Sequence, residues 1–307
     1  MYSGNITFMD IRQDYAPGPP PRLTYEDMFQ RLTQAGLKHG DNVTFHVSLS
    51  SIGWMIGGAE ALLDALLDRL GPAGTVMMPR FPPYGSLDGP FDCHHPPPSG
   101  TGTVPDALGQ RQGAVISIHP THSVVALGPE AEFLTARHYT VSPVGIGSPF
   151  DRMAEIGGLV LLLGVNHLAN TTIHTGEAYA GVAYWGRPRP DRPDGLWVLD
   201  EKRNRRWVQL REIPGDAKGF NRIEPFLVER GLIAFGRIGR ARTRLIPSQP
   251  LIEAVTDYLE EEPDGLLCDQ PDCFPCNLAR HYLHLKRGTR RALNSGRRSP
   301  QSNPSLP

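Results

Sequence analysis

Cysteine is scarce in this chain, with four residues in 307, three of them between positions 268 and 276. So few thiols exclude the class of small secreted domains held together by disulfides. Long hydrophobic runs are also missing, since the longest, Leu159 to Val165, is far shorter than the roughly 20 residues that cross a bilayer. The N-terminal segment carries acidic side chains where a signal peptide would be basic. We therefore expect a cytoplasmic protein that does not enter a membrane.

Neither sign of charge is in excess, because Lys and Arg number 31 against 32 acids, for a net charge of −1. Nucleic acid and anionic lipid attract proteins through positive charge. The balance therefore excludes a general affinity for either partner. With 39% apolar residues, the chain can bury a substantial core as a monomer or a homodimer.

Proline and glycine are plentiful, with 30 and 33 residues, and they gather where we expect joints. APGPPPR favours an irregular leader, because proline lacks an N–H and fixes φ. Residues 81–102 predict a long loop, and a loop of this length inside a domain is commonly part of a site. We predict four parts: a leader (1–22), a main domain (23–262) with a hairpin region (186–222), a Cys/His-rich segment (263–286) and a disordered basic tail (287–307).

Strand and helix patterns alternate along the main domain. We predict a strand, a helix and a strand at 43–50, 57–70 and 75–79, which form a βαβ unit with parallel strands. Residues 158–165 are typical of a strand buried on both faces. The other predictions are a hairpin at 195–200 and 205–213, strands at 114–118 and 123–127, and helices at 23–37, 129–138, 171–182 and 250–262. This is the pattern of an α/β protein.

Two loops follow strands of this predicted sheet, where α/β proteins bind ligands. The first, His46 to Gly58, is rich in serine and glycine, which lets a phosphate or a carbonyl oxygen approach backbone N–H groups. The same composition also suits a tight turn with no ligand. In the second, His174 and Glu177 are three apart on a predicted helix, so the carboxylate can orient the imidazole as a general base. By itself, such a pair is more often structural than catalytic.

A third polar element, His119 to Ser123, lies between two predicted strands. Its two histidines are able to bind a metal, contact a ligand or form hydrogen bonds in the core, and the last interpretation is favoured without context.

Together these segments resemble the aminoglycoside 3-N-acetyltransferases. Members of that family carry H-x-S-L-S-S-x-G-x-x-x-G-G, H-P-T-H-S and N-T-S-x-H-x-x-E in this order, and the chain has the corresponding residues at His46–Gly58, His119–Ser123 and Asn170–Glu177. The likeness extends over about residues 23–245. The resemblance implies a three-layer α/β/α sandwich with a mainly parallel sheet, distinct from the GNAT acetyltransferases. It also implies acetyl transfer from acetyl-CoA to an amine, as in aminoglycoside antibiotic resistance.

The resemblance assigns expected roles to individual residues. His174 matches the family's general base and Glu177 its carboxylate, while Thr171 and Thr172 are placed to stabilise the oxyanion. The expected acetyl-CoA-binding residues are His46, Ser48, Leu49, Ser50, Ser51, Gly53, Thr121 and Ser123. The expected amine-binding residues are Asp92, His119, His122, Glu212 and Asp216.

The chain departs from the family pattern in two places. Members commonly read F-D-P-x-x-T-P-S in the long loop and L-H-L-A-E around the base, where this chain has 91–99 as FDCHHPPPS and 173–177 as IHTGE. The hairpin region also carries many arginines, which would repel a polycationic substrate if they faced it. We therefore expect an altered acceptor pocket.

Two other functions remain open on the sequence. Cys93, followed by His94 and His95, offers a thiolate that could take the acetyl group before the amine does. A protein of the same fold could also bind coenzyme A or a small amine without catalysis.

The C-terminal cysteines suggest a metal. Cys268, Cys273 and Cys276, together with His281, supply the ligands of a closed tetrahedral zinc site, which would be structural. The alternative is a set of packed or exposed thiols.

Overall fold

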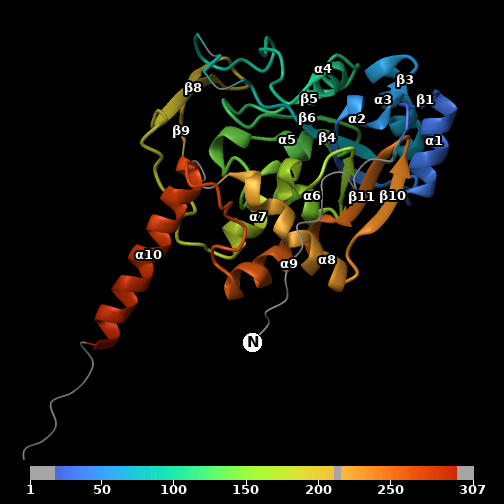
Figure 1. The fold of residues 1–307 in the computed structure, drawn as a ribbon. Helices are drawn as coiled ribbons and strands as arrows, with labels where there is room; N and C mark the ends of the chain where they lie inside the picture. Colours follow the sequence, from blue (N-terminus) through green and yellow to red (C-terminus); the bar gives the residue numbers. More distant parts are fainter. Residues whose placement is uncertain (1–17, 84, 87, 211–215, 296–307) are drawn as a thin grey trace, which may run out of the picture.

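The structure, a computed structural model, describes residues 18–83, 85–86, 88–210 and 216–295. At its centre lies a seven-stranded sheet (Figure 1). Its strands, in spatial order, are β10 (Ala234–Ile238), β11 (Ala241–Pro247), β7 (Leu159–Leu163), β2 (Asn42–Val47), β4 (Thr75–Pro79), β6 (Val124–Leu127) and β5 (Val115–Ile116).

The centre of the sheet is parallel and its two sides are antiparallel. β2 pairs in parallel with β4 and with β7, as the βαβ pattern predicts. β6 and β11, however, run antiparallel to the strands they join. The sheet is thus more antiparallel than expected, because periodicity identifies a strand but not the direction of its partner.

Helices cover both faces of the sheet, so the three-layer α/β/α sandwich is confirmed. Side chains alternate along β7: Leu161 and Leu163 pack with one cluster, Val160 and Leu162 with the other. The first cluster includes residues of α1 (Tyr25–Gln34), α3 (Gly58–Leu70) and α4 (Thr103–Gly109). The second includes residues of α6 (Pro149–Glu155), α7 (Thr172–Tyr179) and α9 (Ser248–Glu261).

Local signals predict several element ends correctly. Thr24 caps α1 through a capping box, in which its hydroxyl accepts from the Asp27 N–H and the Asp27 carboxylate accepts from the Thr24 N–H. α3 ends at Leu70, directly before Gly71. Other helical elements are α2 (Leu49–Ile52), α5 (Ala131–Thr135), η2 (His138–Thr140), η3 (His167–Ala169), η4 (Ala217–Ile223) and α8 (Glu224–Glu229).

The predicted hairpin is present as β8 (Gly195–Leu199) and β9 (Arg205–Gln209), an antiparallel pair. The long loop attaches it to the body. Phe91 exchanges backbone hydrogen bonds with the hairpin, donating to the Trp197 carbonyl at 2.8 Å and accepting from the Leu199 N–H at 2.9 Å. The fully buried Phe91 ring packs with Val198 in a small separate core.

Both predicted terminal boundaries shift. Residues 1–17 of the leader lie outside the described residues, and its last residue begins β1 (Arg22–Leu23), which pairs with β3 (Trp54–Met55). The tail was expected to be disordered from residue 287, but α10 (Phe274–Ser295) continues to Ser295; residues 296–307 lie outside the described residues. Arginine, leucine and alanine in 287–295 propagate a helix once it has begun. Within the described part of the chain, no helix has the length and apolar character needed to cross a bilayer.

Candidate active site

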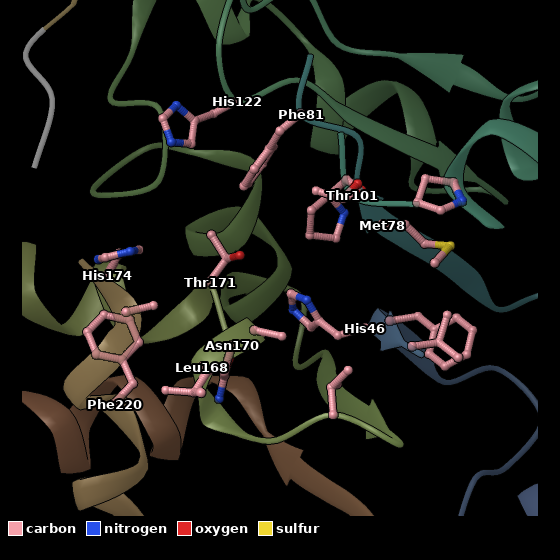
Figure 2. A pocket seen from close by; sticks show the side chains of 17 residues that line it. His46, Met78, Phe81, Thr101, His122, Leu168, Asn170, Thr171, His174 and Phe220 are labelled. Atoms are coloured by element: carbon pink, nitrogen blue, oxygen red, sulfur yellow. Dashed lines mark hydrogen bonds between the residues drawn. The ribbon is translucent and has the colours of Figure 1, made fainter. Parts of the chain in front are cut away.

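A cavity of about 370 Å³ opens at the carboxyl ends of the parallel strands β2 and β7 (Figure 2). Ligands bind at this edge in α/β proteins because the loops after parallel strands meet there. Its wall includes His46 and Val47 from β2, Val165 after β7, and Thr171 and His174 from the start of α7. Figure 2 shows His174 beside Phe220 on one side of the cavity and His46 on another.

His174 forms one end of a chain of hydrogen bonds that runs away from the cavity. Its Nδ1 lies 2.5 Å from Glu177 Oε2, and the Tyr184 hydroxyl donates to Glu177 Oε1 at 2.7 Å. Glu177 and Tyr184 are buried, whereas the His174 side chain is 16% exposed. Burial and the neighbouring carboxylate raise the pKa of Tyr184 well above its ordinary value, so its hydroxyl stays protonated. Because a carboxylate accepts, His174 carries its proton on Nδ1, which leaves Nε2 to accept one.

The His174 ring is also held by packing. Phe220 of η4 meets it edge-on, with ring centroids 4.7 Å apart. The helix that carries the ring, α7, packs against α9 at Gly176, where a Cβ would lie 2.5 Å from the Cβ of Val255. This close contact fixes the position of the helix that carries His174.

The two threonines at the start of α7 lie differently. Thr171 is the N-cap residue and lines the cavity, although its side chain makes no capping hydrogen bond. Thr172 is buried, outside the cavity wall, and among the described residues its hydroxyl has no hydrogen-bond partner.

Two polar atoms in the cavity wall are buried without a partner among the residues that the structure describes: His46 Nε2 and Asn170 Oδ1. Burial lowers the pKa of His46 to about 3, so its ring is neutral at neutral pH. Buried polar groups usually form hydrogen bonds, and such atoms on a cavity wall are suited to a ligand.

A buried ion pair supports the loop that carries Asn170. Arg244 Nε donates to Glu224 Oε2 at 2.5 Å, and His167 Nε2 lies 3.5 Å from the same oxygen. On the other side of the ring, Asn170 Nδ2 lies 3.2 Å from His167 Nδ1. Burial lowers the pKa of His167 to about 3, so the neutral ring can accept from the amide. The chain of contacts fixes the loop just before Thr171.

The serine-rich turn begins directly beyond the cavity wall. The predicted strand 43–50 ends earlier than expected, at Val47, because Ser48 starts the short helix α2 that contains Leu49, Ser50 and Ser51. The Ser48 and Ser51 hydroxyls are 2.7 Å apart. Gly164, with φ of +67°, lets the turn pack on the end of β7, since a Cβ there would lie 2.9 Å from Ser51 Cβ. Gly53 then ends the helix, also with positive φ.

The His-Pro-Thr-His segment divides between cavity and core. His122 lines the cavity and meets the Phe81 ring edge-on, with ring centroids 4.8 Å apart. His119 does not reach it: the ring is buried, and its Nδ1 accepts the backbone N–H groups of Thr121 and His122. Ser123 is buried and donates to the Arg80 carbonyl, outside the wall. Thr121 also lies outside the wall, with its hydroxyl 2.8 Å from the His122 ring.

Two of the carboxylates expected to bind the amine, Asp92 and Asp216, lie outside the cavity wall. Asp92 pairs with Arg203 at 2.6 Å and with His95 at 3.1 Å, and these partners help lower its pKa to about 2 against the opposing effect of burial. Asp216 lies among the C-terminal cysteines, and Glu212 is outside the described residues. Among described residues, the cavity wall contains no carboxylate and no residue of the hairpin strands. The resemblance predicted Asp92 and Asp216 near the substrate, whereas tertiary packing gives these two acids other partners.

Cys93 also lies outside the cavity wall. Burial and the adjacent Asp92 raise the pKa of its thiol, which disfavours the thiolate that covalent transfer requires.

Sequence reasoning missed two neighbours of the base, Tyr184 and Phe220. Tyr184 is seven residues beyond Glu177 and past the end of α7, and Phe220 comes from η4. No motif or periodicity relates either residue to His174, so only the packing of the chain reveals them.

Comparison with known proteins shows the family to which the chain is related. A profile of the aminoglycoside 3-N-acetyltransferases matches residues 45–260. The chain is 33% identical over 259 residues to aminoglycoside N(3)-acetyltransferase IX of Micromonospora chalcea, covering 75% of this chain and 90% of that one. It is 34% identical over 261 residues to aminoglycoside N(3)-acetyltransferase VII of Streptomyces paromomycinus, covering 79% and 88%. The chain belongs to the aminoglycoside 3-N-acetyltransferase family.

Solved structures of this family share the fold. The apoenzyme of aminoglycoside acetyltransferase AAC(3)-IVa superimposes with a TM-score of 0.73 at 29% identity, covering 86% of this chain and 100% of that one. A mutant of the same enzyme in complex with apramycin gives a TM-score of 0.65 at 28% identity, covering 80% and 96%. The protein is therefore an acyltransferase of this family, which implies acetyl-CoA as its co-substrate.

Proposed function

We propose that the protein transfers the acetyl group of acetyl-CoA directly to an amine of an aminoglycoside or a related compound, with His174 as general base. The observation that carries this proposal is the chain His174–Glu177–Tyr184, which leads from a cavity to a buried carboxylate. It leaves one imidazole nitrogen free to accept a proton and provides a negative charge behind the ring.

The reaction needs little from the protein beyond proton removal and alignment, because a thioester is already activated. The amine nitrogen attacks the thioester carbonyl carbon and forms the C–N bond, while an N–H proton passes to His174 Nε2. The C–S bond then breaks, and the coenzyme leaves as a thiolate that takes up a proton from the imidazolium or from water. Glu177 stabilises the positive charge that the ring carries between these steps.

Two further groups support acetyl transfer. Thr171 lines the cavity beside His174, at the positive end of α7, where a hydroxyl or N–H group can stabilise the oxyanion of the tetrahedral intermediate. The turn from Ser48 to Gly53 adjoins the cavity through Val47 and is our candidate for contacts with coenzyme A. The unpartnered atoms of His46 and Asn170 are candidates for hydrogen bonds to either substrate.

The acceptor is proposed from the relatives, whose names specify aminoglycosides. The described wall lacks carboxylates. The main negative charge that can attract a polycation within this cavity is therefore that of Glu177 behind His174. We therefore expect a narrower range of amines than a wall rich in carboxylates would accept.

Thiol release from acetyl-CoA across aminoglycosides, polyamines and amino sugars tests the function. We expect turnover of at least one amine, and a fall in kcat/KM of about 100-fold or more in His174→Ala, which is the scale of general-base catalysis. His39→Ala, which removes an exposed histidine outside the cavity wall, is the matched control and should retain full activity.

Two results would contradict the proposal. Binding of acetyl-CoA in calorimetry, with no turnover of any amine, would indicate a non-catalytic binding protein. Full activity of His174→Ala would remove the assigned base. Cys93→Ala distinguishes direct transfer from covalent transfer through the thiol. We expect this variant to keep its activity, because Cys93 lies outside the cavity wall.

A further inference from the structure

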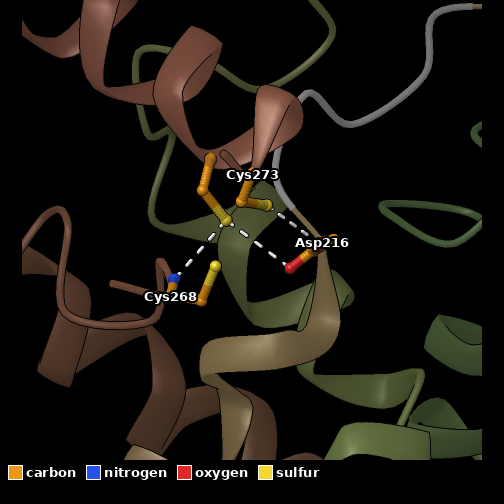
Figure 3. A group of neighbouring side chains, drawn as sticks. Asp216, Cys268 and Cys273 are labelled. Atoms are coloured by element: carbon orange, nitrogen blue, oxygen red, sulfur yellow. Dashed lines mark hydrogen bonds between the residues drawn. The ribbon is translucent and has the colours of Figure 1, made fainter. Parts of the chain in front are cut away.

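A second cluster of reactive side chains lies outside the cavity wall. The thiols of Cys268, Cys273 and Cys276 and the carboxylate of Asp216 place one ligand atom each within 4.8 Å of all the others (Figure 3). The three cysteines are 5%, 4% and 0% exposed. None of the four residues lines the cavity or takes part in the proposed acetyl transfer.

The four side chains come from separate parts of the fold. Asp216 is the N-cap residue of η4, and Cys268 lies in the loop after α9. Cys273 directly precedes α10, and Cys276 lies in its first turn, so the two face the same side at a spacing of three. Convergence of these elements on one point is typical of a cross-link rather than of a chance surface cluster.

The four side chains are in contact with one another, and one sulfur also accepts a backbone hydrogen bond. Asp216 lies 3.2 Å from Cys273 Sγ and 3.5 Å from Cys276 Sγ, and the Cys268 N–H donates to Cys276 Sγ at 3.4 Å. The hydrogen bond from the Cys268 N–H to Cys276 Sγ is of the outer-shell kind that orients a metal-bound thiolate. Without a metal the Cys273 and Cys276 thiols donate to Asp216, and a bound cation would take the place of these protons.

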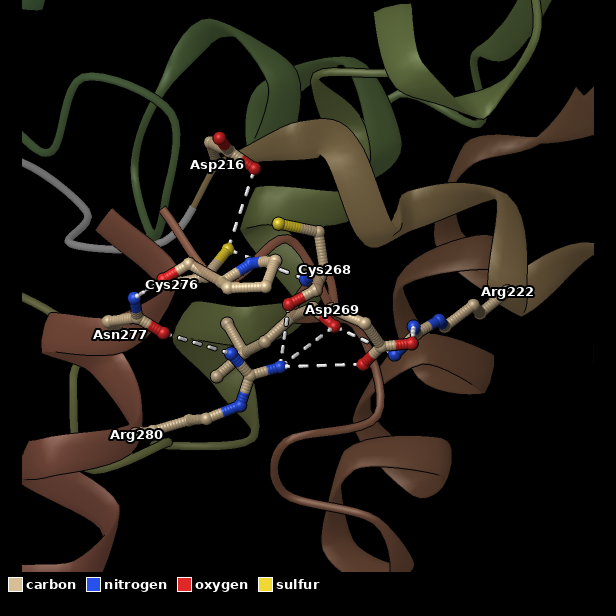
Figure 4. A network of polar contacts seen from close by, with 9 residues as sticks. Asp216, Arg222, Cys268, Asp269, Cys276, Asn277 and Arg280 are labelled. Atoms are coloured by element: carbon tan, nitrogen blue, oxygen red, sulfur yellow. Dashed lines mark hydrogen bonds and ion pairs between the residues drawn. The ribbon is translucent and has the colours of Figure 1, made fainter. Parts of the chain in front are cut away.

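Two arginines, Arg222 and Arg280, lie near the cluster, and both pair with Asp269 (Figure 4). Lys218 lies 3.4 Å from the Asp216 carboxylate, and Arg280 donates to the Cys268 carbonyl at 2.6 Å. Arg222 of η4 donates to the Leu267 carbonyl at 2.7 Å. Three thiolates and a carboxylate around a divalent cation retain two negative charges. The two arginines share one acid, Asp269, so the positive charge of the three basic side chains exceeds that of their acidic partner and helps to offset the cluster.

We infer that Asp216, Cys268, Cys273 and Cys276 bind a thiophilic divalent cation of the zinc type in a closed structural site. Thiolate ligands select such a cation, and four protein ligands leave no open position for catalysis. Bonds of about 2.3 Å to sulfur bring tetrahedral ligands to about 3.8 Å from one another, which small side-chain rotations achieve from the present spacing. The fourth ligand differs from the predicted one: His281 is exposed on α10 and outside the cluster, and Asp216 takes its place.

The site links the C-terminal segment to the wall of the cavity. Asp216 directly precedes Ala217, and η4 also carries Phe220, which packs on the His174 ring. A metal bound here holds the start of α10 against η4 and so supports that part of the wall.

Metal content of the full chain, purified without added metal or chelator, tests the inference without using activity. We expect about one equivalent of zinc per chain by mass spectrometry. Exchange with Co²⁺ should give sulfur-to-cobalt charge-transfer absorption and the visible bands of a tetrahedral site. Removal of the metal with a chelator should lower the thermal midpoint by about 8 °C or more, and zinc should restore it.

Variants assign the ligands. Cys268→Ser and Asp216→Asn should weaken cobalt binding by about 10-fold or more. Cys93→Ser and His281→Ala, which alter a cysteine and a histidine outside the cluster, should bind as the wild type does. If a ligand variant fails to fold, the chelator experiment on the wild-type chain still decides.

Three results would overturn the inference. The first is folded wild-type protein that contains no metal and gives no cobalt bands. The second is a disulfide between two of these cysteines in the native protein, and the third is full cobalt binding by Cys268→Ser. None of these results bears on acetyl transfer by His174, so the two proposals fail separately.

Discussion

Replacing Glu177 with glutamine removes the negative charge behind the proposed base while preserving its shape. The carboxylate is 1% exposed and accepts from both His174 and Tyr184. In the variant, the amide oxygen can still accept from His174 Nδ1, and the amide nitrogen can donate to the Tyr184 oxygen. The hydrogen bonds and packing therefore survive, and what is lost is the stabilisation of the imidazolium.

The expected fall in kcat/KM can be estimated from the change in the hydrogen bond between residues 174 and 177. A bond to a charged group contributes about 1.5–3 kcal/mol, and a neutral one about 0.5–1.5 kcal/mol. The change should therefore cost about 1–2 kcal/mol in the transition state, which corresponds to about a 5- to 30-fold fall in kcat/KM. Because the charge develops only as the proton moves, kcat and kcat/KM should fall together.

Thiol release from acetyl-CoA at varied amine concentration measures this loss, with thermal denaturation as a check on folding. Tyr184→Phe serves as companion, because it removes one donor to the carboxylate but keeps the charge, and its effect should be smaller. A folded Glu177→Gln enzyme with wild-type kcat/KM would refute the role of the charge.

Two further predictions concern stability. Gly176→Ala should lower the thermal midpoint, because overpacking costs about 1–3 kcal/mol and outweighs the gain of about 1 kcal/mol in helix propensity. The new methyl group would meet Val255 Cβ, which cannot rotate away. An unchanged or higher midpoint in thermal denaturation would contradict this prediction. Acid should destabilise the fold below about pH 6.5, because burial lowers the pKa of His46, His138 and His167 to about 3, so only the unfolded chain binds protons between these values. Urea unfolding at pH 7, 6 and 5 checks the sign, since stability should be highest at pH 7. It should fall by up to about 1.4 kcal/mol per pH unit for each such histidine, and the buried His119, whose pKa is also lowered, acts in the same direction.

The sequence by itself determined the features that depend on near neighbours. A capping box at Thr24, the end of α3 at Gly71 and the strand at 75–79 all follow from interactions within a few residues. The same holds for His174 and Glu177, which meet because residues three apart share one side of a helix. Order and spacing of the three motifs identified the family, and with it the sandwich.

Tertiary structure decided which distant groups meet. In the folded chain β6 and β11 run antiparallel to their neighbours, and Tyr184 lies behind Glu177. Asp216, and not His281, lies beside the three C-terminal cysteines. These pairings join residues from separate elements, and their formation depends on how whole helices and strands pack around the two cores. No local pattern encodes such contacts, because the partner that a side chain meets across a layer depends on how all the surrounding side chains pack.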